Sequence, residues 1–185
     1  MILPIYTYGQ PVLRKVAEDI DSSYPDLPQL IQDMYDTLER SEGIGLAAPQ
    51  VGLSIRLAVI NLDVISEDYP EYKGYIRTFI NPHIIEMDET ETDVMEEGCL
   101  SLPGIHEKVR RSKRIHVKYL DDQFQPHDEW VEGYLARVMQ HEFDHLEGHI
   151  FTDHLMGLRK QMANSRLKSI ARGSFSCNYK VKVKH

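Results

Sequence analysis

Apolar side chains recur at helical spacing in three stretches of the chain. Over residues 25–41 they return every three or four positions, which predicts an amphipathic helix that ends before Gly43. The same spacing predicts a second helix that starts after Gly133, ends at Gly148 and is buried along one side. A third helix is expected over residues 153–171, and its apolar side is expected to consist of Leu155, Leu158, Met162 and Leu167.

Shorter apolar or alternating runs predict β-strands between the first and second helices. Residues 56–62 are apolar enough for a buried strand, and residues 77–87 for a strand that is bent or doubled around a proline. Alternation over residues 107–120 predicts a third strand, followed by a hairpin. The first 24 residues and residues 63–75 contain prolines and glycines and are expected to be irregular.

A chain of 185 residues is long enough for one domain with a sizeable core. We expect a single domain over residues 1–172 and a C-terminal tail over residues 173–185, loose or with a short strand. No stretch approaches the roughly 18 apolar residues of a membrane span, and the N-terminus lacks a secretion-signal pattern. We therefore expect a cytoplasmic protein with no membrane partner, whose two cysteines are reduced and available to bind metal.

The net charge of −8 is unevenly distributed along the chain. Residues 151–185 contain eight Lys or Arg and one acid, so this part carries +7 and the remainder −15. A basic segment on an acidic body indicates an anionic partner, such as RNA. The alternative is a solvated helix face without a partner.

The second predicted helix contains Gln140-His141-Glu142-Phe143-Asp144-His145. Two histidines four residues apart lie on one face of a helix, where both rings can bind one metal ion. Glu142 directly follows the first histidine, so its carboxylate can reach a metal-bound water without being a ligand itself. This is the His-Glu-x-x-His pattern of metallohydrolases. The alternative is a helix with two surface histidines, which the flanking apolar residues disfavour.

A catalytic site of this type requires a third protein ligand. The metzincin pattern would place a histidine at the position of Phe151, and no acid follows Asp153. Cys99 is the strongest upstream candidate, while Asp153, His149 and His154 remain open at less favourable spacing; a small buried cysteine is the alternative reading of Cys99. A Cys-His-His set suits Zn²⁺ and equally Fe²⁺, Ni²⁺ or Co²⁺.

Three segments together resemble the motifs of peptide deformylases, in that family's order and spacing. They are Gly43-Ile44-Gly45-Leu46-Ala47-Ala48-Pro49-Gln50, Glu97-Gly98-Cys99-Leu100-Ser101 and Gln140-His141-Glu142-Phe143-Asp144-His145-Leu146. The resemblance extends over about residues 5–155. It implies an α+β catalytic domain in which antiparallel β-sheets surround a central metal-binding helix. It also implies removal of the formyl group from the N-terminal methionine of new polypeptides, with release of formate.

The resemblance assigns the metal site and the base. It implies that Cys99, His141 and His145 hold one divalent ion, with Fe²⁺ expected in cells and Zn²⁺, Ni²⁺ or Co²⁺ possible. Glu142 would take a proton from the attacking water and pass it to the leaving amine. The expected partners are the N-formylmethionyl ends of nascent chains, and the basic C-terminal part is compatible with ribosome contact. DNA is not expected as a partner.

The resemblance also assigns groups that meet the substrate. The side-chain amide of Gln50 and the backbone N–H of Leu100 would donate hydrogen bonds to the oxyanion. Ile44 and Gly45 would hold the peptide backbone as an added strand. Tyr134, Arg137 and His106 depart from the pocket residues expected in the family, which leaves the pocket shape open. The competing functions are a zinc endopeptidase and a non-catalytic, metal-stabilised binding module.

Overall fold

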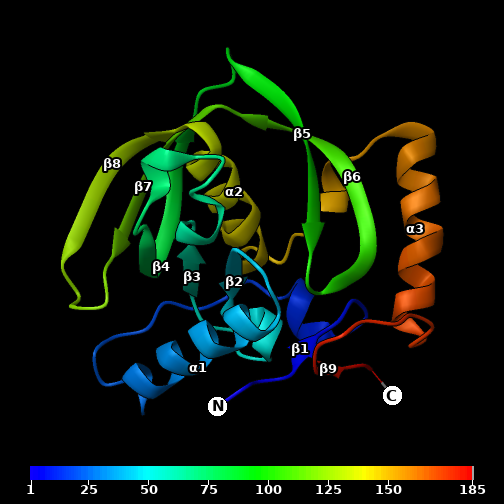
Figure 1. Cartoon of the computed structure of the whole chain (residues 1–185), viewed down its shortest axis with the longest axis horizontal. Helices are drawn as coiled ribbons and strands as arrows, with labels where there is room; N and C mark the ends of the chain where they lie inside the picture. Colours follow the sequence, from blue (N-terminus) through cyan, green and yellow to red (C-terminus); the bar gives the residue numbers. More distant parts are fainter. Residues whose placement is uncertain (185) are drawn as a thin grey trace.

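Helix α2 (Gly133–Leu146) lies between a five-stranded and a two-stranded β-sheet (Figure 1). The structure is a computed structural model, and it describes residues 1–184. All strand pairs within these two sheets are antiparallel. The predicted α+β fold is confirmed, with antiparallel sheets around a central helix and a further helix near the C-terminus.

The five-stranded sheet has the order β2-β3-β4-β7-β8, which leaves β2 at one edge. The predicted buried strand over residues 56–62 is β3, and the predicted bent strand over 77–87 is the single strand β4, whose register shifts against β7. The strands of this sheet are β2 (Gly45–Ala47), β3 (Leu57–Asn61), β4 (Ile76–Met87), β7 (Arg114–Leu120) and β8 (Pro126–Glu132).

One side of α2 packs on this sheet. Phe143 meets Phe79 of β4 edge to face, with 5.6 Å between ring centroids, and Met139 is buried beside them. Burying an aromatic side chain of this size contributes about 1.5–3 kcal/mol. Because this contribution favours keeping Phe143 against the sheet, it restrains the rotation of the helix about its axis. The opposite side of α2, which carries His141, is thereby held toward the two-stranded sheet.

The two-stranded sheet consists of β5 (Thr92–Cys99) and β6 (Leu102–Ser112), joined by a tight turn. The prediction of one strand over residues 107–120 is wrong, because β6 ends at Ser112 and β7 starts at Arg114 in the other sheet. The inward-facing positions are odd-numbered on both sides of this break, so the alternation continues although the chain changes sheets. No strand was predicted over the acidic residues that form β5.

Helix α1 (Leu27–Arg40) agrees with the first predicted helix. The third helix, α3 (Gly157–Ala171), starts later than predicted, because a separate 3₁₀ turn over Phe151–His154 precedes it. Its predicted apolar side is wrong at Leu158 and Met162, which are 69% and 59% exposed. The buried side follows a stripe at i, i+4 and i+7, made by Ala163, Leu167 and Ile170.

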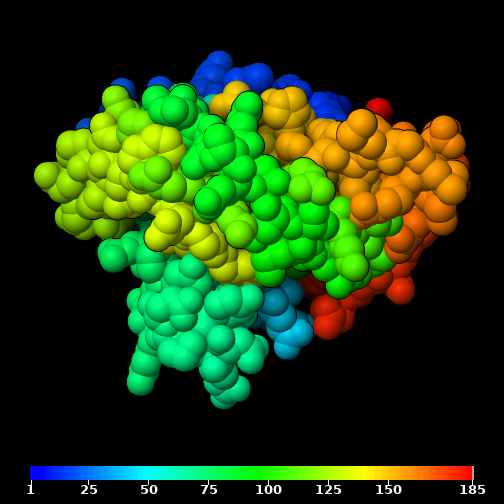
Figure 2. Space-filling view, turned by 90° about the horizontal axis from the view of Figure 1, so that it is seen from above, coloured from blue at the N-terminus to red at the C-terminus, as the bar shows by residue number. Residues whose placement is uncertain are grey.

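The two ends of the chain meet in a small parallel sheet of β1 (Ile5–Tyr6) and β9 (Val181–Lys182) (Figure 1). The tail therefore contains the short strand that the sequence allowed, and the boundary after residue 172 stays a prediction. Residues 63–75 contain short 3₁₀ turns and lie in the teal part that projects in Figure 2. Within residues 1–184, no helix is long and apolar enough to cross a membrane.

Candidate metal centre

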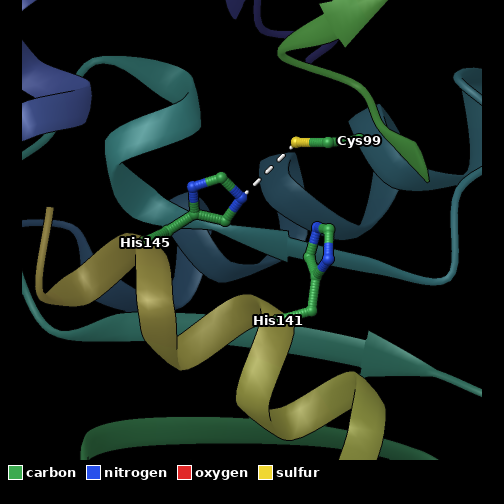
Figure 3. A group of neighbouring side chains, drawn as sticks. All are labelled: Cys99, His141 and His145. Atoms are coloured by element: carbon green, nitrogen blue, oxygen red, sulfur yellow. Dashed lines mark hydrogen bonds between the residues drawn. The ribbon is translucent and has the colours of Figure 1, made fainter. Parts of the chain in front are cut away.

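The structure brings Cys99, His141 and His145 together. Both histidines lie on α2, and Cys99 is the last residue of β5. Figure 3 shows the Cys99 sulfur pointing toward the two rings. One ligand atom from each residue lies within 4.8 Å of the other two, and the Cys99 Sγ to His145 Nε2 distance is 3.5 Å. The alternative third ligands lie outside this group: Asp153 pairs with Arg14, His154 contacts Asp144, and the exposed His149 lies 3.8 Å from Asp153.

The chemistry of these three side chains fits a divalent metal ion. Burial by itself raises the pKa of Cys99, but His145 and His141 outweigh this effect and lower it to about 5. The thiolate is the form of cysteine that binds metals. One thiolate and two imidazoles are ligands of intermediate softness, which suit Zn²⁺ and Fe²⁺ better than Mg²⁺ or Ca²⁺.

A buried carboxylate orients His141. Glu97 lies two residues before Cys99 in β5, and its Oε1 accepts a hydrogen bond from His141 Nδ1 at 2.8 Å. Arg111 donates to both Glu97 oxygens, at 2.6 and 2.9 Å. Burial favours the neutral acid, yet the bonds from His141 and Arg111 hold the pKa of Glu97 well below its ordinary value. Because Nδ1 carries the proton toward Glu97, Nε2 is left with the lone pair that a metal needs.

Glu142 is buried against the glycine-rich segment. Its exposed fraction is 4%, and its Oε2 accepts no hydrogen bond from the described residues. A Cβ at Gly45 would lie 2.6 Å from Glu142 Oε1, so only glycine leaves room for the carboxylate there. Burial raises the pKa of Glu142 against the opposing effect of the two histidines, which suits a group that must accept and then release a proton.

Gln50 reaches the same place from the 3₁₀ turn Ala48–Val51. Its Oε1 accepts a hydrogen bond from the Ala47 N–H at 3.0 Å, which directs the amide nitrogen toward the β5–β6 turn. Gln50 Nε2 lies 3.4 Å from Cys99 Sγ and 3.2 Å from Ser101 Oγ. The amide is therefore a fixed donor beside Cys99.

A cleft of about 400 Å³ opens beside these groups. Its volume falls in the range of small-ligand sites, roughly 300–1,000 Å³. The residues predicted for the substrate and for catalysis all line it, namely Ile44, Gly45, Gln50, Leu100 and Glu142.

Known proteins resemble this chain in sequence and in fold. The sequence matches the family model described as Polypeptide deformylase over residues 2–161. The peptide deformylase of Christiangramia forsetii is 44% identical, covering 98% of this chain and 96% of that protein. A solved peptide deformylase from Legionella pneumophila is similar with a TM-score of 0.80 at 37% identity, covering 93% of this chain and 96% of the other. The solved peptide deformylase from Thermus thermophilus is similar with a TM-score of 0.81 at 35% identity, covering 94% of this chain and 99% of the other.

The chain belongs to the polypeptide deformylase family. It is accordingly an enzyme, a metal-dependent hydrolase that removes the formyl group from the N-terminus of new polypeptides. Family membership does not favour the zinc endopeptidase or the non-catalytic binding module.

The three residues that left the pocket shape open, Tyr134, Arg137 and His106, all line the cleft of this deformylase. Tyr134 stacks on Tyr69, with 5.1 Å between ring centroids. Arg137 is 4% exposed, and it donates to Glu97 at 2.6 Å and to Asp93 at 2.7 Å. The charge of Arg137 is thus neutralised inside the protein.

His106, the third of these positions, packs on Gly98, where a Cβ would lie 2.7 Å from the His106 Nδ1. Gly98 directly precedes Cys99, so the ring of His106 rests on the backbone that leads to the metal-binding sulfur.

Sequence reasoning assigned no role to Glu97 or Arg111, although the structure places both at the histidine. The available signal was the strand period: in a strand, residues two apart share a face, so Glu97 lies on the same face as Cys99. A buried acid on that face requires a cationic or hydrogen-bonding partner. The pairing of β5 with β6 brings Arg111 to Glu97, and this pairing cannot be seen in the local sequence.

Proposed function

We propose that this deformylase acts on the N-formylmethionyl ends of nascent chains with a divalent ion held by Cys99, His141 and His145. The observation that carries the proposal is the convergence of these ligand atoms within 4.8 Å, next to the buried Glu142. We assign Fe²⁺ as the ion in cells, with Zn²⁺, Ni²⁺ or Co²⁺ as substitutes. In this ligand set the ion supplies Lewis acidity, which makes water a better nucleophile near neutral pH.

We assign Glu142 as the group that moves the proton. Its unpartnered Oε2 accepts a proton from water as the water oxygen bonds to the formyl carbon. Glu142 then gives this proton to the amine nitrogen as the C–N bond breaks, which leaves formate and a free N-terminus. The burial of Glu142 supports this role, because a carboxyl group with a raised pKa both takes and returns a proton readily.

Two donors would stabilise the negative charge that develops on the formyl oxygen. Gln50 Nε2 is held beside Cys99 because Gln50 Oε1 is anchored on Ala47. The backbone N–H of Leu100 follows directly after the metal-binding cysteine. One donor of this kind typically contributes about 3–4 kcal/mol to lowering the barrier.

The edge strand β2 offers a place for the peptide backbone. The Ile44 carbonyl already accepts the Asn61 N–H at 2.8 Å, so along the strand the backbone groups of Gly45 point to the free edge. A substrate strand can pair with Gly45 there. We assign to Ile44 an apolar side-chain contact in the cleft.

The basic C-terminal part supports ribosome contact by a cytoplasmic enzyme. Lys168 and Arg172 of the α3 region are exposed, and so are Lys180, Lys182 and Lys184. A variant with Lys168 and Arg172 changed to serine should co-sediment less with ribosomes at low salt. The reason is that two positive charges that would pair with RNA phosphates are removed. Unchanged co-sedimentation would remove this surface from the proposal.

The division into a catalytic domain over residues 1–172 and a tail is likewise proposed.

Formate release from formyl-Met-Ala tests the proposed function. Glu142→Gln should keep its metal, measured by anaerobic elemental analysis, and lose at least about 10²-fold in kcat. The control is Glu89→Gln, an exposed acid outside the cleft, which should behave as the wild type. A Glu142→Gln enzyme with near-normal turnover would remove Glu142 from the mechanism.

A further inference from the structure

The C-terminal segment forms part of the substrate cleft. Ser176, Cys177 and Tyr179 line the cleft together with the glycine-rich segment and the β5–β6 turn. In Figure 2 the red end of the chain reaches the same hollow as the light-blue segment near residue 42, with green β5–β6 beside it. These residues lie beyond the part that matches the family model, which ends at residue 161.

This segment is fixed to the body of the protein. The Ile5 N–H donates to the Lys180 carbonyl at 2.9 Å, and the Thr7 N–H donates to the Lys182 carbonyl at 3.2 Å. The Tyr179 ring and Val181 pack against the buried cluster that also contacts Leu100. Tyr179 is thus anchored through its ring and through the backbone that follows it.

The β5–β6 turn is held by hydrogen bonds from three separate parts of the chain. The Tyr8 N–H donates to the Ser101 carbonyl at 2.9 Å, and Gln50 Nε2 donates to Ser101 Oγ at 3.2 Å. The Tyr179 hydroxyl donates to the Leu100 carbonyl at 2.7 Å. The third bond is the shortest, and it joins residues 79 positions apart.

We propose that Tyr179 is a positioning residue for deformylation, acting through the turn that carries Cys99 and Leu100. This inference rests on the proposed roles of those two residues. The hydroxyl of Tyr179 fixes the carbonyl of Leu100 and thereby the rotation about the bond from its Cα to that carbonyl. The Leu100 N–H is bonded to the same Cα, and Cys99 is joined to that nitrogen by the preceding peptide bond. The restraint on the Leu100 carbonyl therefore also limits the movement of the Leu100 N–H and of the Cys99 side chain.

Loss of this bond would loosen the turn that carries Cys99 and Leu100. A turn with two instead of three restraints samples more positions, and a displacement of about 1 Å at a reacting group can cost about 10²-fold in rate. The remaining bonds to Ser101 limit the displacement here. We therefore expect a smaller loss, of about three- to tenfold, which is the size of one net hydrogen bond.

Tyr179→Phe removes only the hydroxyl and keeps the packed ring. The matched control is Tyr35→Phe, because the Tyr35 hydroxyl is also half-buried, bonds Thr78 Oγ1 at 2.9 Å and lies outside the metal cleft. For formyl-Met-Ala, kcat of Tyr179→Phe should fall about three- to tenfold while KM stays within about twofold. Release of Co²⁺ from the loaded variant to a chelator should be faster by a similar factor. Tyr35→Phe should match the wild type in both assays.

Wild-type kcat and wild-type Co²⁺ release in Tyr179→Phe would overturn the proposal. An equal loss in Tyr35→Phe, or a loss confined to the melting temperature, would also overturn it, because either result points to general stability. If the wild-type protein released no formate, the proposed function would fail, and the metal-release comparison would still decide whether Tyr179 holds the Cys99 turn.

Discussion

Replacing Gly45 with alanine tests how closely the glycine-rich segment must approach the carboxylate of Glu142, the proposed base. The added Cβ would lie 2.6 Å from Glu142 Oε1 and 2.8 Å from its Cδ and Cγ. Real Cβ atoms do not come so close, so either the carboxylate or the strand must move by several tenths of an ångström or more. Glu142 is only 4% exposed and lines the cleft, so a displaced carboxylate would move within the site itself.

The expected result is a loss of turnover with the metal retained. A displacement of the base by up to about 1 Å costs about 10²-fold in rate. We expect Gly45→Ala to lower kcat for formyl-Met-Ala by about that factor, while elemental analysis finds wild-type metal content. The metal content should be kept because the three atoms nearest to the added methyl group all belong to Glu142, which is not one of the proposed metal ligands.

A double-mutant cycle separates this effect from a clash with the substrate. Glu142→Asp shortens the side chain by one methylene and withdraws it from position 45. If the methyl group acts on Glu142, adding Gly45→Ala to Glu142→Asp should cost little further activity. If it blocks the peptide instead, the two losses should multiply. Multiplying losses, or a Gly45→Ala enzyme with nearly wild-type kcat, would refute the reasoning.

Two further predictions concern the metal ligand and the buried ion network. Cys99→Ala should lose its metal in elemental analysis, whereas Cys177→Ala, which removes the exposed cysteine, should retain it; full occupancy in Cys99→Ala would exclude the sulfur as a ligand. Arg137→Leu should destabilise the protein by about 3 kcal/mol in urea denaturation, because Glu97 loses a buried partner. Arg110→Leu, an exposed neighbour of that network, should change stability by no more than about 0.5 kcal/mol, and equal effects of the two would contradict the importance of burial.

A buried ion network surrounds Glu97 beside the cleft. Arg111 and Arg137 both donate to Glu97 Oε2, and Glu97 in turn holds His141. Arg137 also donates to the Val109 carbonyl at 2.9 Å, so the same side chain joins α2 to both strands of the β5–β6 sheet. The orientation of His141, a proposed metal ligand, is therefore coupled to the position of that sheet.

Local patterns were sufficient where the chemistry lies within a few residues. The four-residue separation of His141 and His145 places both on one helical face whatever the tertiary structure. The apolar positions of the same helix predicted its buried side, and Val138, Met139 and Leu146 are buried there. Because the sequence has no suitable ligand downstream of the two histidines, it favoured Cys99 as the third ligand. The structure brings the Cys99 sulfur to the two rings.

Features that depend on long-range pairing were not contained in such patterns. The chain passes from β6 to β7 at Lys113 without a change in alternation, because both strands keep the same inward parity. The residues of α3 allow one stripe with Leu158 and Met162 and another with Ala163 and Ile170. Only the packing on β6 selects the second stripe.

The site itself shows the same division. Residue types and spacing specify a base and two ligands on one helix, because a helix has a fixed period. The contact of Gly45 with Glu142, the bonds of two arginines to Glu97 and the reach of Tyr179 to Leu100 join residues far apart in the chain. Such contacts arise from how the sheets, the helix and the chain ends pack, and no local period encodes them.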